Sequence, residues 1–348
     1  MNILIDIGHT PQLNFYKEVI VKLAEKGNRV YVTVIKRGRL PEIALQELGK
    51  CKNVMVIPIG RHRMNKISAI VDSNILRVFL MFFWSLNKRI DLVFSNGFVA
   101  HVIGWLNRVP CYGFGDDIRG WDFNLKVFFC NQSSYCIYES QKTLSSKAVI
   151  LRCTKEWAYL APQYFQPNPL VLERYGIQPK EYVFLREVSV GTVNYAGQAS
   201  GAIFGIQDLI PNDKKVLFSL EEKDKRHLYP NDWILLQEPI EDIHSLIYYS
   251  AGLVSSGDSM AREAALLGVP AYYLGIRYDM PANAAAAKVA NLQNQKTADF
   301  ATWVKNLEVD AKEAEQKQHA LRQHIDEEFI DINAYMMELV ENVNANKR

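Results

Sequence analysis

The sequence of 348 residues lacks the motifs that mark several large enzyme classes. It has no GxGxxG after an apolar run and no GxxxxGK[ST], which disfavours a dinucleotide-dependent oxidoreductase and a P-loop enzyme. HExxH and GxSxG are also absent, so a zinc protease and a serine hydrolase lose their main support. The five cysteines are odd in number and follow no CxxC spacing. They predict reduced, mostly buried thiols rather than a disulfide frame or a zinc site.

The sequence also has little net charge and no basic start of the kind that opens a signal peptide. Its 40 basic and 38 acidic residues give a net charge of +2, which predicts no nucleic-acid partner. The first segment, MNILIDIGHT, carries Asp6 and His9 where a signal peptide would be apolar. We therefore expect a cytoplasmic protein.

Long apolar runs are missing as well. The most apolar stretch, Val78 to Trp84, is far shorter than the roughly 18–20 residues that span a bilayer. We expect it to form a buried core helix. The alternative is a helix with an aromatic face that touches the inner surface of a membrane beside the basic residues Arg61, Arg63 and Lys66.

What is present is an alternation of short apolar runs with helical patterns. In the first half, apolar runs fall at 2–7, 29–35, 54–57, 92–95, 111–114 and 135–138. The pattern restarts after the proline-rich stretch 161–169, with runs at 182–185, 216–219, 233–236, 253–255 and 271–274. Strands separated by helices of this length predict parallel sheets covered on both faces.

This pattern predicts an α/β fold with two Rossmann-like domains. We place the first domain at 1–165 and the second at 170–310, and we expect a long helical segment in 311–348 that packs back on the first domain. The apolar stripe of that segment is Leu321, Ile325, Phe329, Ile332, Tyr335, Met336 and Leu339.

The segment from Ala251 to Gly275 is the strongest candidate for a ligand site. An apolar run ends at a turn of small residues, 255–259, and a helical pattern follows. Such a turn leaves backbone N–H groups and the positive end of a helix dipole facing outward, which suits a phosphate or diphosphate. Glu263, at i+4 from Ser259, can accept a hydrogen bond from a sugar hydroxyl. The alternative is ordinary helix capping by Asp258 or Ser259.

Candidate catalytic residues follow two strands of the first domain. His9 comes directly after the first strand at a glycine turn, so it can act as a base or a hydrogen-bond donor; the alternative is that it caps the next helix. The loop GFGDDIRGWD holds Asp116, Asp117, Arg119 and Asp122. A carboxylate there can deprotonate a hydroxyl, and a solvated acidic loop is the alternative. Adjacent aspartates diverge, so we expect no metal site.

In the second domain, Arg186 follows the first strand and can neutralise a diphosphate. An ion pair with the adjacent Glu187 is the alternative role for this arginine. The sequence alone leaves both roles open.

The two-domain pattern and VSSGDSMAREAALLGVPAYYLG resemble the nucleotide-sugar half of GT-B glycosyltransferases and of non-hydrolysing UDP-N-acetylglucosamine 2-epimerases. IDIGHTPQLNFYKEVIVKLAEKGNRVYVT and FSNGFVAHVIGWLNRVPCYGFGDD are similar to a branch of prokaryotic glycosyltransferase-like proteins of uncharacterised function. The resemblance spans most of the chain. It implies a GT-B architecture with a cleft between the domains, an acceptor site in 1–165 and a nucleotide-sugar site in 170–310.

The resemblance also implies roles for single residues. Ser256, Gly257 and Ser259 would contact the diphosphate and Glu263 the ribose, and the full expected nucleotide-sugar set adds Arg186 and Asp258. It implies transfer of a sugar from a UDP donor to an envelope or capsule glycan precursor, either a glycan or a lipid-linked acceptor. His9 or Asp117 would be the base, with no metal or other cofactor. The alternatives are a 2-epimerase and a non-catalytic protein that binds sugar nucleotides.

The sequence departs from these families at two places. The stretch FLREVSV has an arginine where the epimerases use a histidine. The His-Thr turn near the N-terminus lacks the glycine-rich second loop of the peptidoglycan N-acetylglucosaminyl transferase. The acceptor contacts of that enzyme therefore cannot be transferred to this chain residue by residue.

Overall fold

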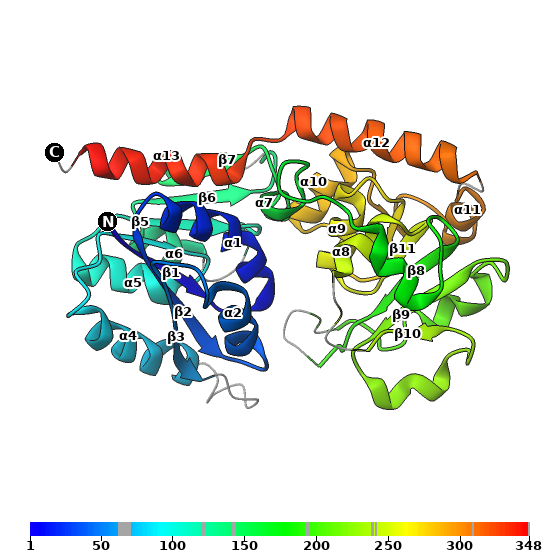
Figure 1. Cartoon of the computed structure of the whole chain (residues 1–348), viewed down its shortest axis with the longest axis horizontal. Helices are drawn as coiled ribbons and strands as arrows, with labels where there is room; N and C mark the ends of the chain where they lie inside the picture. Colours follow the sequence, from blue (N-terminus) through cyan, green and yellow to red (C-terminus); the bar gives the residue numbers. More distant parts are fainter. Residues whose placement is uncertain are drawn as a thin grey trace. The chain divides into compact units, whose positions relative to one another are not determined.

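The structure, a computed structural model, describes residues 1–61, 71–119, 123–140, 144–191, 195, 197–237, 240, 242–307 and 310–346. Arg63, Lys66 and Asp122 lie outside the described residues. The chain divides into two compact units: Met1–Tyr159 with Phe329–Arg348, called unit 1, and Leu160–Glu328, called unit 2. Each unit is a parallel sheet with helices on both faces, so the predicted α/β class is confirmed (Figure 1).

Within its described residues, unit 1 holds a seven-stranded parallel sheet in the order β3-β2-β1-β4-β5-β6-β7. The strands are β1 (Asn2–Ile7), β2 (Arg29–Lys36), β3 (Val54–Arg61), β4 (Leu92–Ser95), β5 (Cys111–Gly115), β6 (Gln132–Cys136) and β7 (Ala148–Leu151). The helices are α1 (Thr10–Glu25), α2 (Leu40–Leu48), the π-helical turn η1 (Val71–Leu76), α4 (Arg77–Ser85), α5 (Phe98–Asn107), α6 (Phe123–Phe129), α7 (Trp157–Leu160) and α13 (Ile332–Ala345).

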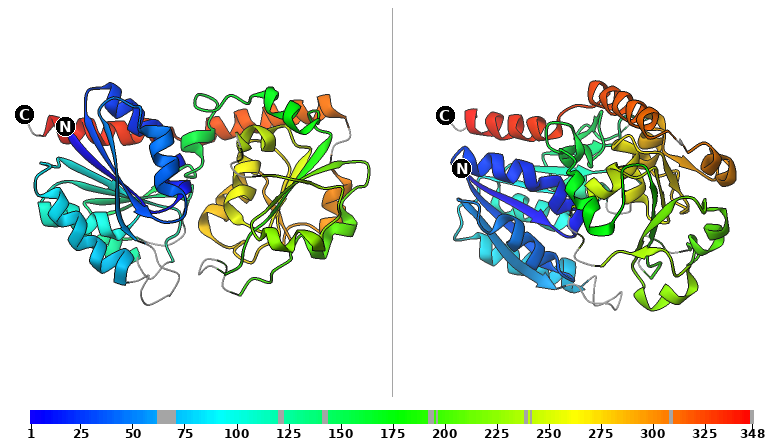
Figure 2. Two further views of the ribbon diagram at one scale, coloured as in Figure 1. Left: turned by 60° about the horizontal axis from the view of Figure 1, so that its bottom comes forward. Right: turned by 45° about the vertical axis from the view of Figure 1, so that its right-hand side comes forward.

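The strand order of unit 1 reverses between β1 and β4, which are parallel neighbours. Helices α1, α2 and α13 pack together on one face of the sheet, and α4, α5 and α6 pack together on the other (Figures 1 and 2). In open sheets of this kind, ligands bind beyond the carboxyl ends of the two strands at the reversal. The chain segments after β1 and β4 are therefore where a site in unit 1 is expected.

A buried ion pair attaches α4 to the sheet. Arg77 Nη1 and Nη2 donate to the two carboxylate oxygens of Asp6 at 3.1 and 2.6 Å, and the Thr33 hydroxyl donates to Asp6 at 2.6 Å. Gly60, with φ of 82°, lies against this arginine, where a Cβ would come within 2.9 Å of Arg77 side-chain carbons. The glycine therefore provides both the backbone conformation and the room that the arginine needs.

The prediction that Val78 to Trp84 forms a buried core helix holds for one side of the helix only, where Met81 is buried and Val78, Phe82 and Trp84 pack against the core cluster of unit 1. Helix α4 turns Arg77 and Met81 inward, whereas Phe79 and Phe83 are 58% and 65% exposed. The ion pair of Arg77 fixes the rotation of the helix, so the residues one helical turn apart from it face the sheet and the aromatic residues between them face outward. In the described residues, every helix is too short or too polar to cross a bilayer.

Within its described residues, unit 2 holds a six-stranded parallel sheet in the order β10-β9-β8-β11-β12-β13. The strands are β8 (Tyr182–Glu187), β9 (Lys215–Leu220), β10 (Ile234–Leu235), β11 (Gly252–Ser255), β12 (Ala271–Tyr273) and β13 (Gln293–Asn294). The α-helices are α8 (Ile243–Tyr248), α9 (Asp258–Leu266), α10 (Pro281–Val289), α11 (Phe300–Lys305) and α12 (Ala311–Glu328). Shorter 3₁₀ turns are η2 (Pro169–Tyr175), η4 (Phe204–Leu209) and η5 (Lys223–Leu228).

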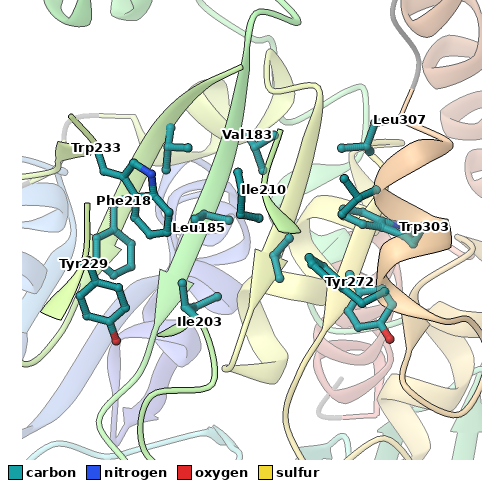
Figure 3. Close-up of a cluster of buried hydrophobic side chains, with 14 of the residues drawn as sticks. Val183, Leu185, Ile203, Ile210, Phe218, Tyr229, Trp233, Tyr272, Trp303 and Leu307 are labelled. Atoms are coloured by element: carbon teal, nitrogen blue, oxygen red, sulfur yellow. The ribbon is translucent and has the colours of Figure 1, made fainter. Parts of the chain in front are cut away.

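An aromatic core covers one face of the unit 2 sheet (Figure 3). The ring of Phe218 lies 4.7 Å from Tyr229 and 5.3 Å from Trp233, centroid to centroid. On the other side of β8, Tyr272 lies 5.4 Å from Trp303. Buried aromatic rings contribute large apolar areas, so this core holds the central strands in place and with them the loops at their carboxyl ends.

Most predicted strands are present within two residues of their expected bounds, apart from β3, which runs on to Arg61, and β6, which begins at Gln132. Strands β7 and β13 were not predicted. The expected long helix of 311–348 is broken, because the Asp331 carboxylate accepts hydrogen bonds from the Asn333 and Ala334 amides and starts α13. Helix α12 belongs to unit 2 and α13 to unit 1. Four of the five cysteines, all except Cys51, are buried, as predicted.

Candidate functional site

The turn after β11 lies at the reversal point of the unit 2 sheet. Strands β8 and β11 are parallel neighbours, and the strand order changes direction between them. This is the position where open α/β sheets bind ligands. The turn 255–257 and the helix α9 that follows it are therefore the first candidates for contact with a ligand.

Hydrogen bonds lock this turn to β8. The Ser255 hydroxyl donates to the Gly257 carbonyl at 2.7 Å and accepts from the Gly257 amide at 3.0 Å. The Ser256 amide donates to the Arg186 carbonyl at 3.0 Å, and its hydroxyl accepts from the Val188 amide at 2.9 Å. Both serine side chains are fully buried. Ser256 therefore shapes the turn, and its hydroxyl is occupied inside the protein.

Helix α9 begins without a side-chain cap from the described residues. Its N-cap residue is Gly257, in extended backbone conformation, so the predicted cap by Asp258 or Ser259 is wrong. The amides of the first turn have no acceptor within a helix, and the helix dipole adds positive potential at this end. Ser259 lies half-buried in this first turn. The arrangement suits the oxygens of an anion such as a phosphate.

Two arginines offset the negative charge of Asp258 in the first turn. Arg262 Nη1 and Arg277 Nη1 each lie 3.2 Å from Asp258 Oδ2, and the Tyr195 hydroxyl donates to the other oxygen at 3.3 Å. Arg262 also donates to the amide oxygen of Asn283 at 2.6 Å. One carboxylate beside two guanidinium groups leaves a positive charge, so an anion at the start of α9 is attracted rather than repelled.

These two arginines were missed in the sequence. Arg262 has a local signal, because it stands four residues after Asp258 on the same helix. Arg277 has none, since it belongs to the loop after β12 and reaches Asp258 only through the fold. The positive charge of the site is therefore largely a tertiary feature.

Glu263 lies one turn further along α9 and is only 7% exposed. His244 Nε2, from the neighbouring helix α8, lies 3.4 Å from Glu263 Oε1. A carboxylate and an imidazole together present several acceptor and donor atoms, which is what neighbouring hydroxyls of a sugar need. The ribose contact of Glu263 stays a prediction, and His244 is an addition to the candidate set.

The side chain of Arg186, a residue of β8, is held by residues at the end of β9. Its guanidinium donates to the Ser219 hydroxyl at 2.7 Å and forms an ion pair with Glu221. The alternative prediction, an ion pair with Glu187, is wrong, because Glu187 points into the core and accepts from the Ile203 amide at 2.7 Å. That burial raises the pKa of Glu187. The charge of Arg186 is thus shared with Glu221.

Unit 1 contains a second turn of the same construction. The Ser95 hydroxyl donates to the Gly97 carbonyl and accepts from the Gly97 amide, both at 3.0 Å. Gly97 is the extended N-cap residue of α5, with φ of −115° and ψ of 145°, against −102° and 136° at Gly257. Among the described residues no side chain caps α5. The turn follows β4 at the reversal point beside β1, so each unit places the same Ser-x-Gly turn at the same topological position.

A cavity of about 250 Å³ lies beside this second turn. Its lining includes Gly97, Phe98, Gly8, Gln12 and Arg37. The sequence signal was an apolar run followed by Ser-x-Gly, which occurs at both 95–97 and 255–257. The sequence-based prediction assigned a ligand-binding role only to the turn at 255–257.

His9 is the N-cap residue of α1, but its side chain makes no capping hydrogen bond, so the capping alternative is wrong. Burial, together with the nearby Lys155, lowers the pKa of His9 to about 4 against the opposing effect of Asp116. The imidazole is therefore neutral at neutral pH. Lys155, in turn, lies 2.8 Å from the Asp116 carboxylate.

Asp117 pairs with Arg119, whereas Asp116 pairs with Lys155 near His9. The Asp117 carboxylate accepts from the Arg119 amide at 2.9 Å and from Arg119 Nε at 3.0 Å. Asp116 and Asp117 thus diverge, each towards its own cation, and it is Asp116 whose charge acts on His9. In the part of the chain that is described, no group of three or more His, Cys, Asp or Glu side chains is placed to hold a metal ion.

Solved structures with a similar fold cover nearly the whole chain. The UDP-GlcNAc 2-epimerase from Neisseria meningitidis, bound to UDP-GlcNAc, aligns with a TM-score of 0.62 at 14% identity over 99% of this chain and 100% of its own. Spinosyn rhamnosyltransferase SpnG, complexed with thymidine diphosphate, aligns at 0.64 and 11% over 98% and 99%. Spinosyn forosaminyltransferase SpnP aligns at 0.66 and 12% over 99% of both chains.

The chain has the GT-B fold. Neither a family model nor a curated protein sequence matches it. At 11–14% identity these structures establish the fold, whereas the reaction has to be argued from the site itself. The GT-B enzymes named above include both glycosyltransferases and an epimerase.

Proposed function

We propose that the chain is a glycosyltransferase that transfers a sugar from a nucleoside-diphosphate donor, UDP first among them, to an envelope or capsule glycan precursor. The observation that carries this proposal is the start of α9 beside Arg262 and Arg277, at the reversal point of the unit 2 sheet, which no side chain of the described residues caps. The UDP-GlcNAc and thymidine diphosphate named for two structures of the same fold support it.

In this proposal the donor diphosphate lies against the first turn of α9. The backbone amides of that turn and the Ser259 hydroxyl donate to the phosphate oxygens, and Arg277 supplies positive charge as the leaving diphosphate gains negative charge. Ser256 and Gly257 hold the turn in shape, with Asp258 orienting the two arginines. Glu263 accepts hydrogen bonds from the ribose hydroxyls, and no metal ion is required.

The acceptor binds in unit 1, near the Ser95-x-Gly97 turn. Its hydroxyl oxygen forms the new bond to the anomeric carbon while the bond from that carbon to the diphosphate oxygen breaks. His9 Nε2 or Nδ1 takes the hydroxyl proton, because its imidazole is neutral, and Asp116 partly offsets the unfavourable effect of burial and Lys155 on the imidazolium that results. Asp117 is the other predicted base, and its carboxylate is already bonded to Arg119.

Calorimetric titration with UDP tests the donor site. Wild-type protein should bind UDP, and Glu263→Ala should bind it roughly 10–100-fold more weakly, since hydrogen bonds to a charged group contribute about 1.5–3 kcal/mol. Glu173→Ala, an exposed glutamate of the same unit, should bind like the wild type. Equal affinity for UDP in both variants, at unchanged melting temperature, would refute the assignment.

A second candidate function is 2-epimerisation, which the epimerase of the same fold favours. Arg186 stands where epimerases use a histidine, which weighs against it. Incubation with UDP-N-acetylglucosamine and no acceptor separates the two functions, because only an epimerase forms the manno epimer. Tight UDP binding, with full biological activity after His9→Ala and Asp117→Ala, would instead indicate a non-catalytic binding protein.

A further inference from the structure

One face of unit 1 exposes an unusual amount of apolar surface. On α4, the side chains of Phe79, Leu80 and Phe83 are 45–65% exposed, while the inward stripe of this helix has Arg77 and Met81. A helix of a soluble domain normally buries its apolar stripe against the core and turns its polar side outward. Helix α4 packs Val78, Met81 and Phe82 against the core but also turns Phe79, Leu80 and Phe83 outward, and the buried pair of Arg77 with Asp6 holds it in that orientation.

The exposed apolar surface continues onto the next two helices. Helices α4, α5 and α6 pack side by side on this face of the sheet (Figures 1 and 2). Trp105 of α5 and Phe128 of α6 are 56% and 64% exposed. Their rings are linked through Phe129, which lies 5.6 Å from Trp105 and 4.9 Å from Phe128. We call this surface of the three helices the α4–α6 face.

Within the three helices of the α4–α6 face, every formal charge is positive. Helices α4, α5 and α6 contain no aspartate or glutamate. Exposed Arg108 ends α5, and Arg108 and Lys147 line a hollow of about 630 Å³ together with Trp105 and Phe128. Lys88, just beyond α4, lies over the Trp84 ring at 5.9 Å. The apolar side chains of α5 and α6 are therefore bordered by cations, and a hollow beside Leu80 and Trp84 of α4 is lined by Lys36 and Arg61 with Asp72 as its one carboxylate.

We propose that the α4–α6 face docks on the surface of a bilayer that contains anionic phospholipids. Exposed phenylalanine, leucine and tryptophan side chains beside lysine and arginine are the composition of helices that lie in a membrane interface. The cations beside the hollow match the negative headgroups, and each adds attraction to an anionic surface. If two copies of the chain docked on each other through this face, their cations would face each other, and lysine is depleted in protein interfaces. This proposal does not depend on the donor site of unit 2.

Co-sedimentation with lipid vesicles tests this surface. Wild-type protein should sediment with vesicles of phosphatidylcholine and phosphatidylglycerol, less so at high salt, and far less with phosphatidylcholine alone. The pair Phe79→Ser and Phe83→Ser should weaken this partitioning about tenfold or more, because two exposed rings lose their place in the interface. Arg108→Glu should weaken binding and reduce its dependence on salt. Phe204→Ser, which changes a residue of unit 2 that is 48% exposed, should bind like the wild type.

The substituted side chains are exposed, so thermal melts of all variants should match the wild type. UDP affinity should also be unchanged in the Phe79 and Phe83 pair, which separates this proposal from the donor site. Wild-type protein that ignores anionic vesicles, or the serine pair binding them normally, would overturn the proposal. A further contrary result would be a wild-type dimer in ultracentrifugation that becomes a monomer in the serine pair, while the wild-type protein binds no vesicles. That last result would assign the face to a second copy of the chain.

Discussion

Replacing Gly257 by alanine should destabilise unit 2, while the same change at Gly97 should not destabilise unit 1 to the same extent. Both glycines are the extended N-cap residue of a helix after a Ser-x-Gly turn. A Cβ at Gly257 would lie 2.6 Å from Val188 Cγ1, whereas the nearest atom at Gly97 is the Ser95 hydroxyl at 3.9 Å. Only one of the two changes therefore creates a steric conflict.

The expected loss of stability in Gly257→Ala follows from the contact between the new Cβ and Val188. Val188 is buried and its amide donates to Ser256, so it cannot move away without disturbing the turn. Overpacking of this kind costs about 1–3 kcal/mol, which for a unit of this size lowers the melting temperature by roughly 2–12 °C. The two variants share the loss of glycine at an N-cap and the same change in unfolded-state entropy. Their difference thus isolates the Val188 contact.

Scanning calorimetry of both variants, with hydrogen exchange to assign each transition to a unit, measures that difference. Val188→Ala combined with Gly257→Ala should recover part of the loss, because it removes the methyl group that the new Cβ meets. UDP affinity should fall in Gly257→Ala and not in Gly97→Ala, since the turn at α9 is displaced. Equal losses of stability in the two glycine variants, or no recovery in the double variant, would refute the reasoning.

Two further predictions concern unit 1. Arg77→Met should lower the free energy of unfolding by about 3–5 kcal/mol in urea denaturation, because it leaves the Asp6 carboxylate buried without its cationic partner. The double variant Asp6→Asn with Arg77→Met should recover part of that loss. An Arg77→Met variant as stable as the wild type would contradict the structure. The folded-state pKa of His9, about 4 against 6.5 ordinarily, makes its contribution to stability complete above pH 6.5 and lost as the pH falls from 6.5 towards 4. His9→Asn should therefore flatten the pH dependence of the urea-derived free energy of unfolding over that range, and an unchanged slope would show that folding does not lower the pKa of His9.

The fold could be predicted from the sequence because its signals are local. Apolar runs of four to eight residues and helical periodicity mark strands such as β1 and helices such as α1. Strand β7 was missed although its residues 148–151 form an apolar run of the same length as others that were predicted. Strand β13 escaped prediction for a physical reason, since Gln293–Asn294 is a polar pair that joins the sheet through backbone pairing with β12.

The candidate site was only partly predictable. The turn 255–257 and its helix have a sequence pattern, but a pattern does not show which hydroxyls are consumed inside the protein, and Ser256 is one of them. The pairing of Asp258 with Arg277 joins residues of different loops and has no local signal. Periodicity likewise gives the spacing of apolar residues on α4 without the direction that they face, which a buried pair to Asp6 decides.

The hydrogen bonds of Ser256 divide the proposed donor site into residues that can be substituted to change the ligand and residues that are needed for the fold. Because Ser255, Ser256 and Gly257 bind one another, Arg186 and Val188 at the end of β8, Gln198 and Leu274, substitutions there alter the sheet before they alter the choice of ligand. Libraries aimed at a new sugar nucleotide should keep that tripeptide and vary Ser259, His244 and Arg277. Those positions surround the start of α9 without holding the two strands together.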